Sequence, residues 1–141
     1  MARIVSTALD PAGVLDLVAG ADRGGTVLFV GTVRDHHLGR GVVELEYSAY
    51  EAMAELEIAA ILAEAETRFS TVVEAVHRSG KLAVGEISIV VAAAHAHRDA
   101  AFEACRWTLD EIKQRVPIWK HESYADGSSE WVEPCATGRD A

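Results

Sequence analysis

The chain has 141 residues, half of them apolar and a quarter charged, which suits a single globular domain with its own core. Its formal net charge of −9 argues against a nucleic-acid-binding protein, because such proteins usually present basic surfaces. No apolar run approaches the roughly 20 residues of a membrane-spanning helix, and residues 1–10 lack the features of a signal peptide. We therefore expect a cytoplasmic protein that binds neither membranes nor nucleic acids.

Short strands and one short helix are predicted in the first part of the chain. Residues 4–9 have the composition of a strand. Asp10 and Pro11 mark the start of a helix, as a capping residue followed by proline in the first helical turn. A continuous apolar run over residues 26–30 predicts a buried strand that leads into a polar loop.

A long helix between strands is predicted in the middle of the chain. Apolar and acidic residues alternate over residues 43–47, as in a half-buried strand. Residues 51–69 contain no glycine or proline and predict an amphipathic helix. Strands follow at residues 72–77 and 87–94, the second of them buried, with a turn at residues 79–81. The expected core side chains of the helix are Met53, Leu56, Ile58, Ala60, Ile61 and Leu62.

A second long helix follows the buried strand, and Pro117 ends it. Residues 118–124 then alternate as a strand, and an Asp-Gly hairpin signal precedes a returning strand at residues 130–132. Because strands and helices interleave, we expect an α+β fold with a mixed or largely antiparallel sheet. We expect a single domain over residues 1–133 and a flexible C-terminal tail over residues 134–141. The expected core stripe of the second helix is Phe102, Cys105, Leu109, Ile112 and Val116.

A few cationic side chains occupy distinctive places in this acidic chain. Arg34 follows a buried strand, and His97 and Arg98 lie where a strand gives way to a helix N-terminus, which attracts anions. Lys113 lies near the end of that helix, and Lys120 lies on the strand after it. Together they would suit an anion-binding site, whereas each alone is equally an ordinary surface residue that pairs with an acid.

The strand predicted at residues 118–124 separates its side chains into two sets. Lys120 and Glu122 point to one face of the sheet, and Trp119 and His121 point to the other. A carboxylate beside a lysine would hold the ammonium group and tune its pKa.

The remaining candidates for chemistry carry weaker signals. The histidine pairs at 36–37 and 95/97 lack the partners of a zinc site, so we expect no metal and no cofactor. Cys105 falls in a core stripe and Cys135 in the tail, so we expect neither a nucleophilic thiol nor a disulfide. Trp107 falls nearly opposite the core stripe of its helix, which predicts a subunit contact or the covering of another element.

Motifs with matching order and spacing are spread over residues 3–133. They are Gly31-Thr32-Val33-Arg34-Asp35-His36, Leu45-Glu46-Tyr47 with Tyr50-Glu51-Ala52-Met53, His77-Arg78-Ser79-Gly80 with Leu82 and Gly85-Glu86, Ala96-His97-Arg98 with Ala101-Phe102-Glu103-Ala104, and Lys113 with Pro117-Ile118-Trp119-Lys120-His121-Glu122 and Trp131-Val132. Each motif alone is weak. As an ordered set they resemble the MoaE family, the large catalytic subunits of molybdopterin synthase.

The resemblance implies a fold, a reaction and an assembly. The fold would be of the α/β-hammerhead type, and the chain would form a homodimer within a heterotetramer. Each large subunit would bind a ubiquitin-like small subunit whose C-terminal Gly-Gly tail carries a thiocarboxylate. The enzyme would be a sulfurtransferase that converts cyclic pyranopterin monophosphate (precursor Z) to molybdopterin in molybdenum cofactor biosynthesis.

The resemblance also implies roles for single residues. Lys113 and Lys120 match the two catalytic lysines of the family's pocket, with Lys113 nearer the thiocarboxylate carbon. Thr32, Val33 and Arg34 match the loop that contacts the pterin substrate.

Two further pairs match substrate-binding positions. His97 and Arg98 match a motif for the substrate's phosphate, which the family often supplies across the dimer interface. His121 and Glu122 would line the same pocket as the lysines. Other members often carry Arg where this chain has His121, so the role of this position stays open.

Two alternatives compete with the enzyme. One is a scaffold of the same family that binds the small subunit without turnover, which we would expect to lack Lys113 or Lys120. The other is an unrelated α+β regulatory module that binds a phosphorylated ligand and needs no Gly-Gly-tailed partner. The presence of both lysines favours the enzyme.

Overall fold

Residues 1–132 are described in the computed structural model of the protein, and they form helices and strands in an interleaved order. The elements are β1 (Ile4–Val5), α1 (Pro11–Val18), β2 (Gly25–Thr32), β3 (His36–His37), β4 (Arg40–Ala49), α2 (Glu51–Phe69), β5 (Val72–Arg78), β6 (Gly80–Ala83), β7 (Ile87–His95), α3 (Arg98–Arg115), β8 (Ile118–Tyr124) and β9 (Ser129–Val132). The tail expected at residues 134–141, with Cys135, lies outside the described residues.

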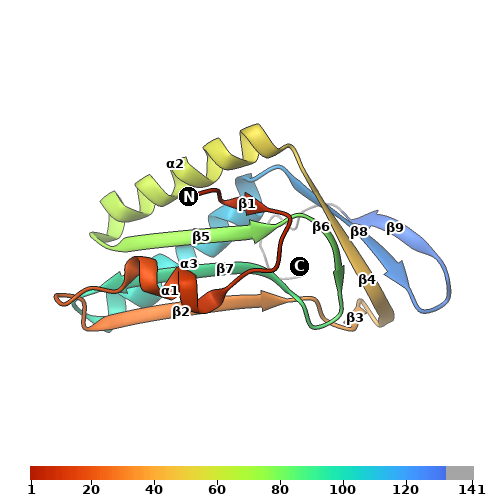
Figure 1. Cartoon of the computed structure of the whole chain (residues 1–141), viewed down its shortest axis with the longest axis horizontal. Helices are drawn as coiled ribbons and strands as arrows, with labels where there is room; N and C mark the ends of the chain where they lie inside the picture. The colour runs from red at the N-terminus through yellow and green to blue at the C-terminus, as the bar shows by residue number, and fades with distance from the viewer. Residues whose placement is uncertain (133–141) are drawn as a thin grey trace.

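The strands form two sheets. The first has the order β1-β5-β7-β2, in which only β1 and β5 run parallel. The second has the order β3-β4-β8-β9, and β6 also pairs with β4. The first sheet occupies one half of the molecule and the second sheet the other (Figure 1). The expected α+β class with mixed, largely antiparallel pairing is therefore confirmed.

The helices bury both faces of the first sheet. Alternate side chains of β7 point to opposite faces, and all of them between Ser88 and Ala94 are buried. Ile89, Val91 and Ala93 pack against α2 and α3, whereas Val90, Ala92 and Ala94 pack against α1. Burial on both faces explains why this strand is a continuous apolar run. A third cluster fills the second sheet with Val33, Val42, Leu45, Leu82 and Tyr124.

The prediction of a buried strand at residues 26–30 was wrong about burial. Strand β2 lies at the edge of the first sheet and pairs only with β7. Leu28 and Phe29 are each 37% exposed in the single chain. An apolar run identifies a strand, but its place in the sheet decides whether both faces are covered.

The bounds of α2 match the prediction, but the core faces of the two long helices were partly wrong. Met53, Leu56, Ala60 and Phe102 are exposed, whereas Ile58, Ile61, Leu62, Cys105 and Ile112 are buried. Small side chains lie beneath the helices because they allow the backbones to approach the sheet and one another. These small buried residues are Ala54, Ala65, Ala101, Ala104 and Thr108.

Three local expectations also need correction or completion. The first strand is only Ile4–Val5 rather than residues 4–9. The turn expected at residues 79–81 contains the start of β6, which extends to Ala83 and pairs with β4. Trp107 is partly buried and meets the ring of Phe69 edge-on at 5.9 Å, so within this chain it covers the end of α2.

Within residues 1–132, no helix combines the length and apolar character needed to cross a membrane.

A tight hairpin turn joins β3 to β4. His37 pairs with Arg40, which leaves Leu38 and Gly39 as the two turn residues. Both have positive φ, 49° for Leu38 and 79° for Gly39, as in a type I′ turn. Leucine adopts this left-handed conformation at a cost, because its Cβ crowds the following carbonyl.

We predict that Leu38→Asn stabilises the protein, since Asn tolerates positive φ and the Leu38 side chain is 80% exposed and packs little. The free energy of unfolding in urea, at fixed protein concentration, should rise by about 1 kcal/mol. Leu38→Ala is the matched control, because it removes the same apolar side chain and keeps the unfavourable conformation. Equal stabilities for the two variants would contradict the turn assignment.

Candidate functional site

A small cavity lies where β2 leaves the first sheet and the chain enters the second. Its volume is about 60 Å³. Five of its lining residues were predicted from the sequence as site residues: Thr32, Val33, Arg34, Lys120 and Glu122. The other lining residues are His36, His37, Val42, Leu45 and Tyr47.

A close contact at Gly31 positions the loop that forms one wall of the cavity. A Cβ at Gly31 would lie 2.7 Å from Cγ2 of Ile89, so only glycine allows β2 and β7 to approach this closely. The pairing register shifts just after it, between Gly31 and Thr32. Buried Val33 then accepts a hydrogen bond from the Gly85 backbone N–H at 2.7 Å and donates one to the Glu86 carbonyl at 2.9 Å. Val33 thus anchors the loop, while its neighbours Thr32 and Arg34 remain exposed.

The opposite wall comes from the paired strands β4 and β8. Tyr47 pairs with Lys120 and Leu45 with Glu122, so these four side chains share the face toward the cavity. Lys120 is half-buried and Glu122 is only 2% exposed. His121 points to the other face, where its ring lies 4.9 Å from that of Trp131. The structure therefore brings Glu122, but not His121, to the same cavity as Lys120.

A line of polar contacts crosses the cavity. Nη2 of Arg34 lies 3.2 Å from Nδ1 of His37. Nε2 of His37 lies 3.7 Å from Oε1 of Glu122, and both residues are buried. Within residues 1–132, no donor lies within hydrogen-bonding distance of this Glu122 oxygen. The cavity thus has a cation at one edge and a buried carboxylate oxygen with unused acceptor capacity at the other.

Lys113 does not line the cavity, but its charge acts on His77, whose ring contacts the lining residue Tyr47. His77 is 7% exposed, and its ring meets the ring of Tyr47 edge-on at 4.9 Å. Burial is the largest cause that lowers the pKa of His77 to about 4, and the nearby Lys113 charge lowers it further. Burial and the Glu122 charge raise the pKa of Tyr47, while Ser88 and Arg34 oppose them. The charges of Lys113, Arg34 and Glu122 therefore act on the same pair of rings.

The structure does not bring His97 and Arg98 to this cavity within one chain. They lie at the N-terminus of α3, directly beside Gly25. A Cβ placed on Gly25 would be only 3.0 Å from the Cα atom of Arg98. Gly25 begins β2, and Thr32 ends it beside the cavity. At about 3.3 Å per residue the two ends of β2 are about 23 Å apart. Both His97 and Arg98 are exposed in the single chain.

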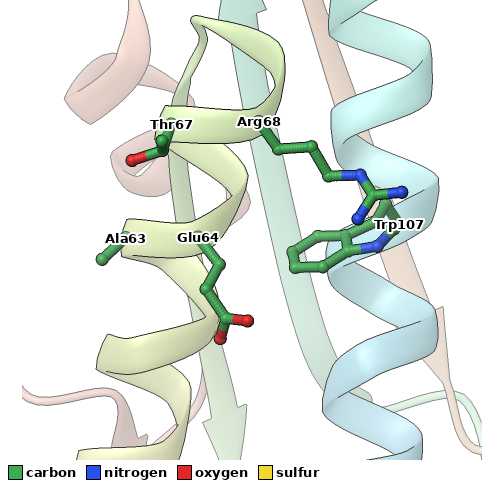
Figure 2. Close-up of a pocket in the computed structure, with 5 residues that line it drawn as sticks. All are labelled: Ala63, Glu64, Thr67, Arg68 and Trp107. Atoms are coloured by element: carbon green, nitrogen blue, oxygen red, sulfur yellow. The ribbon is translucent and has the colours of Figure 1, made fainter.

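A larger hollow of about 440 Å³ lies between α2 and α3, lined by Ala63, Glu64, Thr67, Arg68 and Trp107. Figure 2 shows the Arg68 guanidinium beside the Trp107 indole, and the guanidinium carbon lies 5.4 Å from the ring. Glu64 pairs with Arg115 at 2.7 Å. The charged side chains of this hollow, Glu64 and Arg68, thus each interact with a residue of α3 and hold the two helices together. None of the predicted site residues lines the hollow.

The part of the chain that the structure describes contains no cluster of three or more His, Cys, Asp or Glu side chains arranged to hold a metal ion. Cys105 is buried, and burial raises the pKa of its thiol to about 11, so it stays protonated near neutral pH. The chemistry available at the cavity is therefore that of lysine, arginine, carboxylate, imidazole and phenol side chains.

Sequence reasoning missed the parts that His37 and Tyr47 play in the cavity. Tyr47 lies in a motif that the sequence singled out, but alternation predicted only that it is half-buried. His37 was noted beside His36 without a role. The available signal was Gly39 two residues later, because a two-residue turn there would have folded His37 back against β4.

Comparisons with known proteins agree with this geometry. The model of the family described as "MoaE protein" matches residues 4–115. A molybdopterin synthase catalytic subunit from Culex quinquefasciatus is 46% identical over 129 residues, covering 89% of this chain and 82% of the relative. One from Pyrococcus abyssi is 48% identical over 118 residues, covering 83% of this chain and 79% of the relative. The crystal structure of molybdopterin synthase from Staphylococcus aureus matches with a TM-score of 0.88 and 32% identity, covering 93% of this chain and 96% of that one.

The fold and these relatives identify the chain as a subunit of an enzyme. The family match covers most of the chain, and both relatives are more than 40% identical to it over the aligned residues. The chain belongs to the MoaE family of molybdopterin synthase catalytic subunits.

We predict that buried His77 makes the stability of the protein depend on pH. Below its ordinary pKa of 6.5 the unfolded state takes up a proton that the folded state accepts only near pH 4. The free energy of unfolding contributed by His77 therefore falls as the pH drops through this window, by about 2 kcal/mol between pH 7 and pH 5.

Urea unfolding of the wild type and of His77→Asn at both pH values tests this. Asn retains a side-chain N–H for the Arg78 carbonyl, to which Nδ1 of His77 donates at 2.8 Å, but Asn does not titrate. The variant should lose less stability between pH 7 and pH 5 than the wild type. Equal losses would show that His77 is not held neutral by the fold.

Proposed function

We propose that the chain catalyses the conversion of cyclic pyranopterin monophosphate to molybdopterin, with the C-terminal thiocarboxylate of a ubiquitin-like small subunit as sulfur donor. The observation that carries the proposal is the convergence of Arg34 and Lys120 on one cavity, with the Lys113 charge acting on the wall behind it. The relatives' name, catalytic subunit, also implies a second kind of subunit.

The charges of the two reactants explain why cations gather here. A cyclic phosphate and a thiocarboxylate are both anions, and this protein carries a net charge of −9. Bringing them together requires a local positive field that overcomes the repulsion of the whole surface. Arg34 and Lys120, which line the cavity, and Lys113, whose charge reaches His77 beside its wall, supply such a field, with Arg34 suited to a planar anion.

The chemistry needs two steps for each sulfur. The thiocarboxylate sulfur attacks a carbon of the pterin side chain that carries an oxygen of the cyclic phosphate. The carbon–sulfur bond forms as that carbon–oxygen bond breaks, the phosphate stays attached through its other ester bond, and the product is a thioester between the small subunit and the substrate. Water then attacks the thioester carbonyl, which releases the small subunit as a carboxylate and leaves the sulfur on the pterin as a thiolate. A second small subunit supplies the second sulfur in the same way, at a neighbouring carbon whose oxygen leaves as water.

Lysine is the group suited to the hydrolytic step. Attack on the thioester carbonyl develops negative charge on oxygen, which an ammonium group stabilises in a partly desolvated site. We assign this role to Lys113 and the positioning of the tail carboxyl to Lys120, whose charge lies on the cavity wall. A contact with Glu122 on the same face would keep Lys120 directed inward.

The proposal includes an assembly in which two copies complete each site. Arg98 and His97 are exposed about 23 Å from the cavity of their own chain. Strand β2 beside them is an edge strand with exposed apolar side chains, which suits a contact between copies. In a homodimer each copy would lend this cationic helix N-terminus to the phosphate bound at its partner. A cytoplasmic location accompanies the proposal, and it suits the free thiol Cys105.

Product formation in vitro tests the reaction. The protein, precursor Z and a thiocarboxylated small subunit should yield molybdopterin, and Lys113→Ala should lower kcat by about a hundredfold or more while it still binds the small subunit. Lys81→Ala is the matched control, because Lys81 is exposed on β6 and does not line the cavity.

Other outcomes would favour the alternatives. Binding of the small subunit without product would identify a non-catalytic scaffold. Binding of the phosphorylated pterin without any affinity for the small subunit would identify a regulatory phosphate-binding module.

A further inference from the structure

His37 lies between two opposite charges in the wall of the cavity. It is 7% exposed and has Nδ1 at 3.2 Å from the Arg34 guanidinium and Nε2 at 3.7 Å from Oε1 of Glu122. Arg34 comes from the loop after β2 and Glu122 from β8, so the imidazole on β3 lies between side chains of two other segments.

The position of the proton on this ring follows from its neighbours. A guanidinium group only donates hydrogen bonds, so Nδ1 of His37 must accept and carries no proton. The ring's single proton then resides on Nε2, where it faces the Glu122 carboxylate. Both neighbours favour the same tautomer.

The backbone holds the ring in this place. His37 pairs with Arg40 across the two-residue turn at Leu38 and Gly39. The Val42 backbone N–H donates to the Asp35 carbonyl at 2.8 Å, which closes the hairpin on its other side. The imidazole is therefore carried by a short hairpin that backbone pairing fixes on both sides of His37.

We propose that His37 is a positioning residue for Arg34. Its imidazole accepts from the guanidinium at 3.2 Å and fixes the direction of the cation at the edge of the cavity, where the proposed anionic substrate binds. Without the ring, the guanidinium would lose this acceptor and the direction that it imposes. This inference rests on the proposed function for its substrate, but the proton position belongs to the protein alone.

Two substitutions separate the functions of the two ring nitrogens. In His37→Asn the side-chain oxygen can occupy the place of Nδ1 and accept from Arg34. In His37→Gln the side-chain NH₂ can occupy the place of Nε2 and face Glu122, but the acceptor for Arg34 is lost. Comparable urea midpoints for the two variants would establish that both fold.

We expect KM for the cyclic pyranopterin monophosphate to rise about tenfold in His37→Gln, with kcat changed less than twofold. In His37→Asn, which keeps an acceptor for Arg34, KM should stay near the wild-type value. A fall in kcat alone, equal KM values in wild type and His37→Gln, or an equal rise in KM in both variants would overturn the proposal.

A measurement without substrate separates this proposal from the proposed function. Nitrogen-15 NMR of the His37 ring in the wild-type protein at pH 7.5 should show an unprotonated Nδ1 and a protonated Nε2, and Arg34→Met should weaken this preference, since only the Glu122 carboxylate then favours it. The opposite tautomer, or no effect of Arg34→Met, would refute the role of His37 even in an active enzyme. The protein could also show the predicted tautomer but make no product and bind no pterin. That result would refute the proposed function and, with it, the substrate role of Arg34.

Discussion

The passage of the chain from one sheet to the other at Gly31–Val33 is the constraint on which the site depends. At Gly31 the two strands approach so closely that a Cβ would strike Ile89. Two backbone hydrogen bonds then tie Val33 to the turn before β7. Because the loop is fixed at both points, Arg34 emerges beside β4 and β8 rather than over the first sheet. The cavity is therefore a consequence of how the two sheets are joined.

The electrostatics of the cavity follow from that junction. The protein is acidic overall, yet Arg34, Lys120 and Lys113 come from three different elements and act on one small region. Burial strengthens each interaction there, since the local dielectric constant is lower than that of water. The lowered pKa of His77 and the raised pKa of Tyr47 are two signs of this desolvated environment. A neutral imidazole and a neutral phenol thus separate the cations without adding charge of their own.

Local patterns predicted the elements better than their packing. Periodicity found α2 to the residue and placed Lys120 and Glu122 on one face, because both follow from backbone geometry alone. It misplaced Phe102, Met53 and Leu56, because small residues such as Ala54 and Ala104 face the sheet and the helices turn accordingly. Nor does periodicity say that His37 folds back to meet Glu122, since that contact depends on a turn in which Leu38 adopts an unfavourable conformation.

Glu122 adds an energetic cost to the fold at this site. Its side chain is 2% exposed, and one of its oxygens faces the cavity without a hydrogen-bond donor among the described residues. An unsatisfied buried polar atom destabilises a fold by about 1–3 kcal/mol, so a sequence selected for stability alone would replace it. The neighbouring hairpin adds the strain of Leu38. Glu122 lines the cavity, and the turn that contains Leu38 presents His37 to the same cavity. Both costs therefore fall on the segments that hold a carboxylate and an imidazole in place there.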